Sequence, residues 1–132
     1  MLIPSIHFSG NCNEAIEFYT QTVGAKVCAI YYAKDAPADF GAGLAPNFVM
    51  HSEVDFFGTK LSLTDGNEAP PASDSYTFMI MLKSAQEVTE VFHKLADGGT
   101  ISEPLAPQFW ADLYGSLTDR FGVNWSVMYP EA

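Results

Sequence analysis

The chain has 132 residues, almost half of them hydrophobic, which suits one packed domain and excludes a disordered chain. Sixteen Asp and Glu outnumber six Lys and Arg, and the formal net charge is −10. Such an acidic surface repels phosphate backbones and anionic lipids, so we expect no nucleic-acid partner and no membrane partner. We also find no apolar run of membrane-spanning length and no signal-peptide pattern, which predicts a cytoplasmic protein.

The first half of the chain predicts a strand, a capped helix and three more strands. Asn11 followed by Glu14 is a capping pattern for the helix start, and Gly24 marks its end. Pro4 indicates that the first strand lies at a sheet edge. The expected strands cover residues 2–8, 27–33, 48–57 and 60–64, with a hairpin turn at Gly58-Thr59 and a long loop over 34–47.

The second half of the chain repeats this order. A strand over 76–83 leads to a second capping pattern, Ser84 with Glu87, and the helix that follows ends at Gly98-Gly99. We then expect a short strand near Ile101, a loop over 104–108, and two strands over 112–118 and 123–129 that flank the turn 119–122.

An internal repeat follows from this shared order. A shift of 73 residues places Asn11 on Ser84 and Glu14 on Glu87. The sequence therefore predicts an α+β fold of two βαβββ modules, which form a curved mixed sheet around a cleft with the helices outside. We expect one domain over 1–132, with module 1 over about 1–66, a linker over 67–74 and module 2 over about 75–132.

Two thiols occur in the chain, Cys12 and Cys28, and they form no CxxC pair. A pair of isolated thiols in a chain of this length is typical of a reducing compartment. Cys12 follows the expected helix start, where the helix dipole can lower a thiol pKa. We nevertheless interpret it as a structural, inert thiol.

Alternation along the third strand predicts a His–Glu pair. If Met50, Ser52, Val54 and Phe56 pack under the helix, then Val49, His51, Glu53 and Asp55 face the cleft or solvent. A His facing a Glu can act as a general base near neutral pH. The alternative is a solvated sheet face or a His with a purely structural hydrogen bond. The same parity turns Ser5 and His7 outward on the first strand.

The two closing strands supply the other cleft candidates. Val123, Trp125, Val127 and Tyr129 point one way, and Asn124, Ser126 and Met128 point the other. Aromatic walls with a few polar groups are typical of small-molecule pockets. The alternative places Trp125 in the core and Trp110 in a packing or dimer contact. The candidates here are Trp110, Tyr114, Ser116, Asn124 and Ser126.

Four segments carry a family resemblance: FSGNCNEAIEFY, VMHSEVDFFGTKLSLTDG, GGTISEPL and FWADLYGSLTDRFGVNWSV. Together with the repeated βαβββ unit they resemble the PhnB-like branch of the vicinal-oxygen-chelate superfamily, which includes glyoxalase I, bleomycin-resistance proteins and extradiol dioxygenases. Ala111-Asp112-Leu113 departs from the pattern of that branch. The resemblance implies a homodimer with a small-molecule cleft, and it implies no single reaction.

Enzymes of this superfamily usually hold a divalent metal through His and Glu side chains. The matching positions here are Ile3 or Pro4, Ser62, residues 76–78 and Ser126, and none is a His or a carboxylate. Transition metals require two or three such ligands. We therefore expect no metal and no other cofactor.

Three functional hypotheses remain open. The first is metal-free binding of a small molecule in the cleft, by Ser5, His7, Ser62, Trp110, Tyr114, Ser116, Asn124 and Ser126. The second is a metal-independent lyase or isomerase that acts on a small carbonyl or enol substrate, with His51 and Glu53 as catalytic residues. The third is sequestration of a cationic drug, similar to bleomycin resistance.

Overall fold

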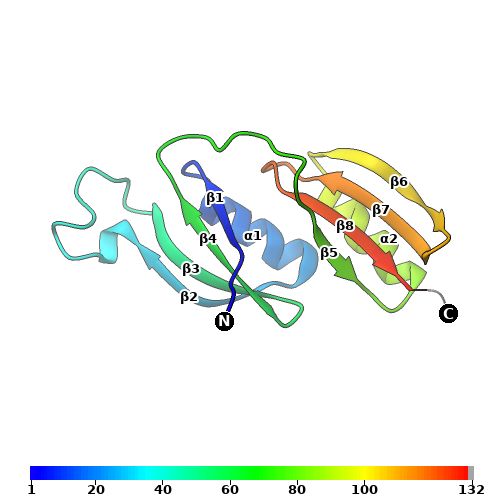
Figure 1. The fold of residues 1–132 in the computed structure, drawn as a ribbon. Coiled ribbons are helices and arrows are strands. Elements are labelled where there is room, and N and C mark those ends of the chain that lie inside the picture. Colours follow the sequence, from blue (N-terminus) through cyan, green and yellow to red (C-terminus); the bar gives the residue numbers. More distant parts are fainter. Residues whose placement is uncertain (131–132) are drawn as a thin grey trace. The chain divides into compact units, whose positions relative to one another are not determined.

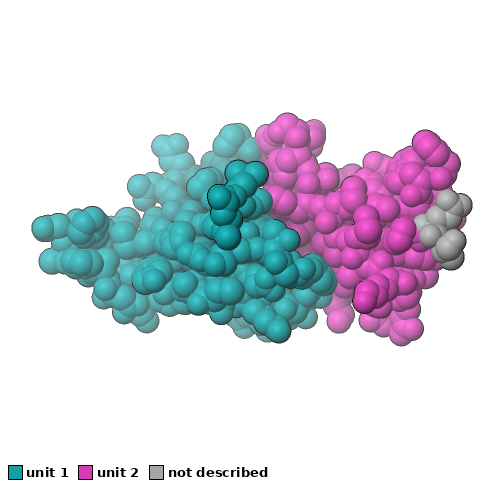
Figure 2. All heavy atoms as spheres, turned by 60° about the horizontal axis from the view of Figure 1, so that its bottom comes forward, with its two compact units in different colours: residues 1–71 teal, residues 72–132 magenta. Residues whose placement is uncertain are grey.

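The computed structural model describes residues 1–130 and contains two four-stranded sheets, each with one long helix (Figure 1). The chain divides into two compact units, unit 1 over residues 1–71 and unit 2 from residue 72 onward (Figure 2). Neither of the described helices is long and apolar enough to cross a bilayer.

Unit 1 is a βαβββ module. Its elements are β1 (Ser5–Phe8), α1 (Cys12–Val23), β2 (Lys26–Tyr32), a 3₁₀ turn (Ala33–Asp35), β3 (Val49–Phe56) and β4 (Thr59–Asp65). The strand order is β1-β4-β3-β2, with β1 parallel to β4 and the other pairs antiparallel. The edge position that Pro4 predicts for the first strand is confirmed.

Unit 2 repeats the module. Its elements are β5 (Phe78–Met81), α2 (Ala85–Ala96), β6 (Thr100–Gln108), β7 (Ala111–Thr118) and β8 (Asn124–Tyr129). The order β5-β8-β7-β6, with β5 parallel to β8, matches unit 1 strand for strand. The α+β class and the internal repeat are therefore confirmed.

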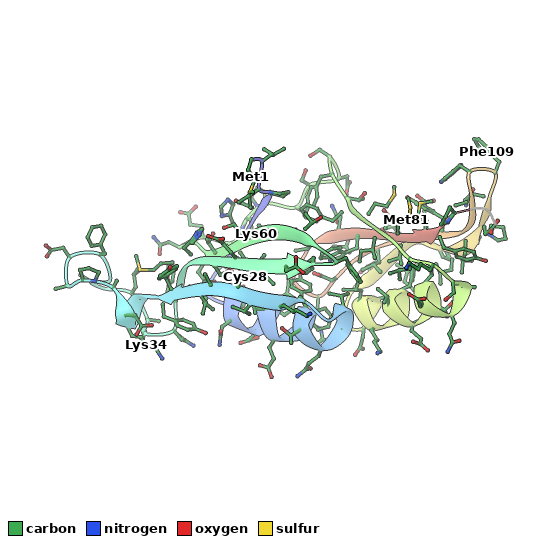
Figure 3. All side chains as sticks on the ribbon, turned by 90° about the horizontal axis from the view of Figure 1, so that it is seen from below. Met1, Cys28, Lys34, Lys60, Met81 and Phe109 are labelled. Carbon is green, nitrogen blue, oxygen red and sulfur yellow. The ribbon has the colours of Figure 1, made fainter. Side chains whose placement is uncertain are left out.

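Each helix packs on one face of the sheet in its own unit (Figures 1 and 3). In unit 1, Tyr19 of α1 is fully buried and its ring meets that of Phe56 edge to face, with ring centroids 5.4 Å apart. In unit 2, Val88, Phe92 and Leu95 of α2 form the buried stripe. The opposite face of each sheet carries no helix of its own unit, and that face holds the candidate site residues.

The start of α1 differs from the prediction. Asn11 makes no side-chain cap to the helix, and its Oδ1 accepts a hydrogen bond from the Ser9 amide instead. The cap comes from Asp65 at the end of β4, whose Oδ1 accepts hydrogen bonds from the amides of Gly10 and Cys12 at 2.8 and 3.0 Å. The predicted Asn11–Glu14 capping pattern is thus wrong, because a carboxylate distant in sequence satisfies these donors.

The loop predicted over 104–108 is also wrong, since these residues belong to β6. Proline cannot donate to a strand ladder, which is why Pro104 and Pro107 predict a break. β6 tolerates both because it is an edge strand and because its register with β7 shifts between Ile101 and Glu103 and twice more before Gln108.

The predicted alternation of buried and outward-facing side chains along β3 is observed with one exception. Ser52, Val54 and Phe56 are buried, as predicted, but Val49 is buried as well. Its amide donates a hydrogen bond to Asp65 Oδ2 at 2.9 Å. The strand therefore begins tied to the end of β4, and outward alternation starts only at His51.

Candidate functional site

Three strands of unit 1 present polar side chains on the face turned away from α1. Register places Ser5 beside Ser62, Ser62 beside Glu53, and His7 beside Thr64, so these side chains share one face. Figure 3 shows Lys60 on the side of the sheet opposite α1. We call this surface the polar face, and its members are Ser5, His7, His51, Glu53, Lys60, Ser62 and Thr64.

Three charged or titratable groups form a chain across the polar face. Glu53 Oε2 lies 3.1 Å from His51 Nε2, and Glu53 Oε1 lies 3.0 Å from Lys60 Nζ. The hydrogen bond from Lys60, and then that from His51, lowers the pKa of Glu53, while Glu53 raises the pKa of Lys60. All three groups are accessible to a solute, with side-chain exposures of 48% for His51, 30% for Glu53 and 40% for Lys60.

The ionised carboxylate fixes the orientation of the His51 ring. A carboxylate only accepts hydrogen bonds, so His51 Nε2 carries the proton in the bond to Glu53. In the neutral imidazole, Nδ1 then holds the lone pair and is the acceptor. Tyr31 of β2 faces His51 in the register, and the two rings stack with centroids 6.2 Å apart. His51 is thus held from two sides.

The remaining predicted residues of unit 1 lie beside this chain. His7 Nδ1 is 2.9 Å from Thr64 Oγ1, and Ser5 and Ser62 are neighbours in the register. The structure places Ser5, His7, His51, Glu53 and Ser62 on one face of the sheet. It adds Lys60, which is not among the residues predicted from the sequence. The hairpin turn lies at Phe57-Gly58 and not at the predicted Gly58-Thr59, and it aligns Asp55 with Lys60, one step along the face from Glu53.

The predicted residues of unit 2 occupy a face of different chemistry. Ser116 and Ser126 are register neighbours, and Met79 flanks Ser126 on its other side. Trp110 contacts Tyr114 edge to face, with ring centroids 5.7 Å apart. Ser126 is fully buried, and its Oγ has no hydrogen-bond partner among the described residues. This face carries buried serine hydroxyls, thioethers and aromatic rings, and Glu103 is the register neighbour of Ser116 on β6.

Asn124 is engaged structurally. Its Nδ2 donates hydrogen bonds to the backbone carbonyls of Ser73 and Tyr76, at 2.6 and 3.3 Å. Its Oδ1 accepts a hydrogen bond from Thr118 Oγ1 at 2.7 Å. The amide therefore ties β8 to the segment that precedes β5, and these contacts use its donors and its acceptor.

The positions that the family resemblance assigns to metal ligands do not fit a transition metal here. At two of them the available donors are the hydroxyls of Ser62 and Ser126, which are poor ligands for transition metals. Among the residues that the structure describes, no three His, Cys, Asp or Glu side chains gather closely enough to hold an ion.

Cys12 behaves as a structural thiol. It is fully buried at the start of α1, and burial, with a smaller contribution from the nearby Asp65 carboxylate, raises its pKa. The expected lowering by the helix dipole is outweighed, because the apolar surroundings disfavour the thiolate.

The chain is similar in sequence and structure to several known proteins. Residues 1–128 match the family model described as 3-demethylubiquinone-9 3-methyltransferase. The chain is 29% identical to Protein YjdN of Escherichia coli (strain K12), over 96% of this chain and 92% of that protein. It is 32% identical to protein PA1353 from Pseudomonas aeruginosa, with a TM-score of 0.83, covering 100% of this chain and 98% of that structure.

The fold is shared more widely. A structure described as a putative 3-demethylubiquinone-9 3-methyltransferase, PhnB protein, from Bacillus cereus has a TM-score of 0.82 at 24% identity, covering 97% of this chain and 98% of that one. A glyoxylase/bleomycin resistance protein/dioxygenase domain from Frankia sp. EAN1pec has a TM-score of 0.70 at 11% identity, covering 99% and 91%. The chain belongs to the 3-demethylubiquinone-9 3-methyltransferase family, in the PhnB-like branch of the vicinal-oxygen-chelate superfamily.

Proposed function

We propose that the polar face of unit 1 binds a small molecule rich in oxygen groups, without a metal. The observation that carries this proposal is the chain His51–Glu53–Lys60, with contacts of 3.1 and 3.0 Å. These two contacts hold the imidazole of His51 and the ammonium group of Lys60 in fixed positions on the sheet. A site whose groups are held before the ligand arrives loses less entropy on binding.

The hydrogen-bonding capacity of the face supports a hydroxylated carbonyl compound as the ligand. Lys60 has donors beyond the one that it gives to Glu53, and His51 Nδ1 is an acceptor. Ser5 and Ser62 offer hydroxyls that donate or accept, and the Tyr31 ring adds an apolar flank. A few placed polar groups beside an aromatic wall are the usual composition of a small-molecule site.

Proton transfer is the second candidate function, and the His51–Glu53 hydrogen bond favours it. In such a step the bond between a proton and the carbon next to a carbonyl breaks, and His51 Nδ1 takes the proton. The electron pair of that bond forms an enolate, with the charge on the carbonyl oxygen. Glu53 stabilises the imidazolium that results, because His51 Nε2–H points at its carboxylate.

Dihydroxyacetone, a neutral hydroxylated ketone, is a suitable probe for both candidates. Binding is measured by NMR as chemical-shift changes at the polar face, and proton transfer as deuterium uptake by the probe in D₂O. We expect His51→Gln to weaken binding about fivefold, which is the loss of one net hydrogen bond. His93→Gln is the matched control, since His93 is exposed on α2, where its Nδ1 hydrogen-bonds the Thr89 carbonyl, and it is not part of the polar face.

The two measurements separate the hypotheses. Shifts at the polar face without deuterium uptake support binding alone, and uptake that is lost in His51→Gln and kept in His93→Gln supports catalysis. Equal binding by both variants would contradict the proposal. S-adenosylmethionine is included as a further probe: a raised melting temperature in its presence would favour the methyl transfer that the family description names.

A further inference from the structure

Three of the five methionines of the chain gather on one face of the sheet in unit 2. Register places Met81 of β5 directly beside Met128 of β8. Met79 lies two residues before Met81 on the same strand, so its side chain points to the same side of the sheet. We call Met79, Met81 and Met128 the methionine cluster. The cluster spans two adjacent strands and places three thioethers side by side.

The methionine cluster lies on the side of the sheet that α2 does not cover. The register row between the two methionines of β5 runs from Ile80 to Gly115 and faces α2, because a Cβ added at Gly115 would lie 2.7 Å from Cε1 of Phe92. The rows on either side of it therefore point away from α2, as Met81 does in Figure 3. Met79 and Met81 are 55% and 60% exposed, although methionine is among the residues most often buried. Both thioethers are thus open to a solute.

The spacing of the methionine cluster suits a single bound ion. Neighbouring strands lie about 4.8 Å apart and residues along a strand rise about 3.4 Å each, so the point equidistant from the three residues is about 4 Å from each of them. A methionine side chain has three rotatable bonds, and metal–sulfur bonds are about 2.3 Å long. The three Sδ atoms can therefore reach one ion above that point of the sheet without a change in the backbone.

We propose that the methionine cluster binds the soft monovalent ion Cu(I). Thioethers are soft, uncharged ligands that select Cu(I), whereas Mg²⁺ and Ca²⁺ take oxygen ligands. Tyr114, the register neighbour of Met128, adds an aromatic ring beside the cluster, and cations are attracted to such rings. None of the three methionines occupies a position that the family resemblance assigns to a metal ligand. The proposal does not depend on the proposed function of the polar face.

Ag(I) is the probe for the cluster, because it shares the charge and the soft character of Cu(I) and is stable in air. The full chain carries Cys28→Ser in every measurement, which removes the exposed thiol, itself a soft ligand. Isothermal titration measures the affinity, and NMR of methyl-labelled methionines identifies the side chains that bind. We expect the methyl signals of the cluster to shift. Met79→Leu and Met81→Leu should each weaken binding at least about tenfold, because even the loss of a group that only supports a metal ligand costs about 10–100-fold.

Met50→Leu is the matched control, since Met50 lies on β3 of unit 1 and outside the cluster. Its methyl signal should not shift with Ag(I), and the affinity of this variant should be unchanged. Equal losses in Met50→Leu and Met81→Leu, or cluster methyl signals that stay in place with Ag(I), would overturn the proposal.

The pH dependence of binding separates thioethers from other ligands. Thioethers have no proton to release, so the affinity should be the same at about pH 5.5 and about pH 7.5, whereas His and Cys ligands must first lose a proton. A marked loss of affinity at the lower pH would assign the ion to such ligands and would also overturn the proposal. The exposed positions of Met79 and Met81 tolerate leucine without loss of the fold, so their variants report on binding alone.

Discussion

The two units build the same module but start their helices in different ways. In unit 2 the cap is local, since Ser84 Oγ accepts a hydrogen bond from the Glu87 amide three residues later. In unit 1 the cap is Asp65, which is 53 residues from Cys12 in sequence. A local cap forms with the helix itself, whereas a distant carboxylate caps α1 only once β4 has joined the sheet. The start of α1 is therefore coupled to the folding of its unit.

The sheet faces that carry no helix also differ between the two units. Unit 1 carries a chain of charged or titratable groups, His51–Glu53–Lys60, and unit 2 carries Ser116, Ser126 and exposed methionines at the corresponding face. One repeated backbone thus supports two surfaces of different chemistry. The fold of a module and the chemistry of its helix-free face are therefore specified by different positions along the same strands.

Asp65→Ala should give the largest effect and tests the distant cap. The substitution removes the acceptor of three backbone amides, those of Gly10, Cys12 and Val49. Buried donors without a partner are costly, so we expect a loss of about 3 kcal/mol in the free energy of unfolding. Urea unfolding measures it, with Asp74→Ala as the exposed control. A loss below about 1 kcal/mol, the value of an ordinary cap, would contradict the larger structural role that the three amide contacts assign to Asp65.

Ser84→Ala and Asn11→Ala form the next pair, with intermediate effects. Ser84 caps α2 directly, and its removal should cost about 1 kcal/mol. Asn11 occupies the matching position of the repeat but makes no cap to α1, so its removal should cost less than about 0.5 kcal/mol. Urea unfolding of both variants measures the difference. Equal losses would mean that Asn11 also caps its helix in solution.

Local patterns account for what the sequence predicts correctly. The period of apolar residues and the glycine stops find both helices, and alternation on β1 and β3 turns His7, His51 and Glu53 to one face. The errors have separate causes. The Asp65 cap depends on a partner 53 residues along the chain, which local patterns do not contain. The pairing of residues 104–108 is local, with Ala106 opposite Tyr114 and Gln108 opposite Ala111, and was hidden by prolines that an irregular edge strand tolerates.

Parts of the candidate site also lay beyond sequence reasoning. The alignment of Lys60 with Asp55 follows from the observed turn at Phe57-Gly58, which lies one residue before the predicted turn at Gly58-Thr59. A hollow lined by Tyr32 and Phe40 beside the loop over 34–47 was not predicted, because its wall depends on how this loop folds back through bonds such as Lys34 to Pro46. Irregular loops carry no periodic signal from which their shape can be derived.

The smallest expected effect concerns the pH dependence of the Glu53–Lys60 contact. The folded-state pKa of Glu53 is lowered from 4.5, so its contribution to stability is present above that value and is lost as the pH falls through the folded-state pKa. The folded-state pKa of Lys60 is raised from 10.5, so its contribution is present below that value and is lost as the pH rises through the folded-state pKa. The contact is fully formed between these limits.

Lys60→Met should therefore raise the pKa of Glu53 toward 4.5, because Lys60 is the largest cause of its lowering. An NMR titration of the Glu53 carboxyl carbon measures this shift directly. Lys83→Met, which removes an exposed Lys of unit 2, is the control for net charge. An equal shift in both variants would assign the lowering to the charge of the whole protein. A shift confined to Lys60→Met assigns the lowering to the contact between Lys60 and Glu53 on the polar face of unit 1.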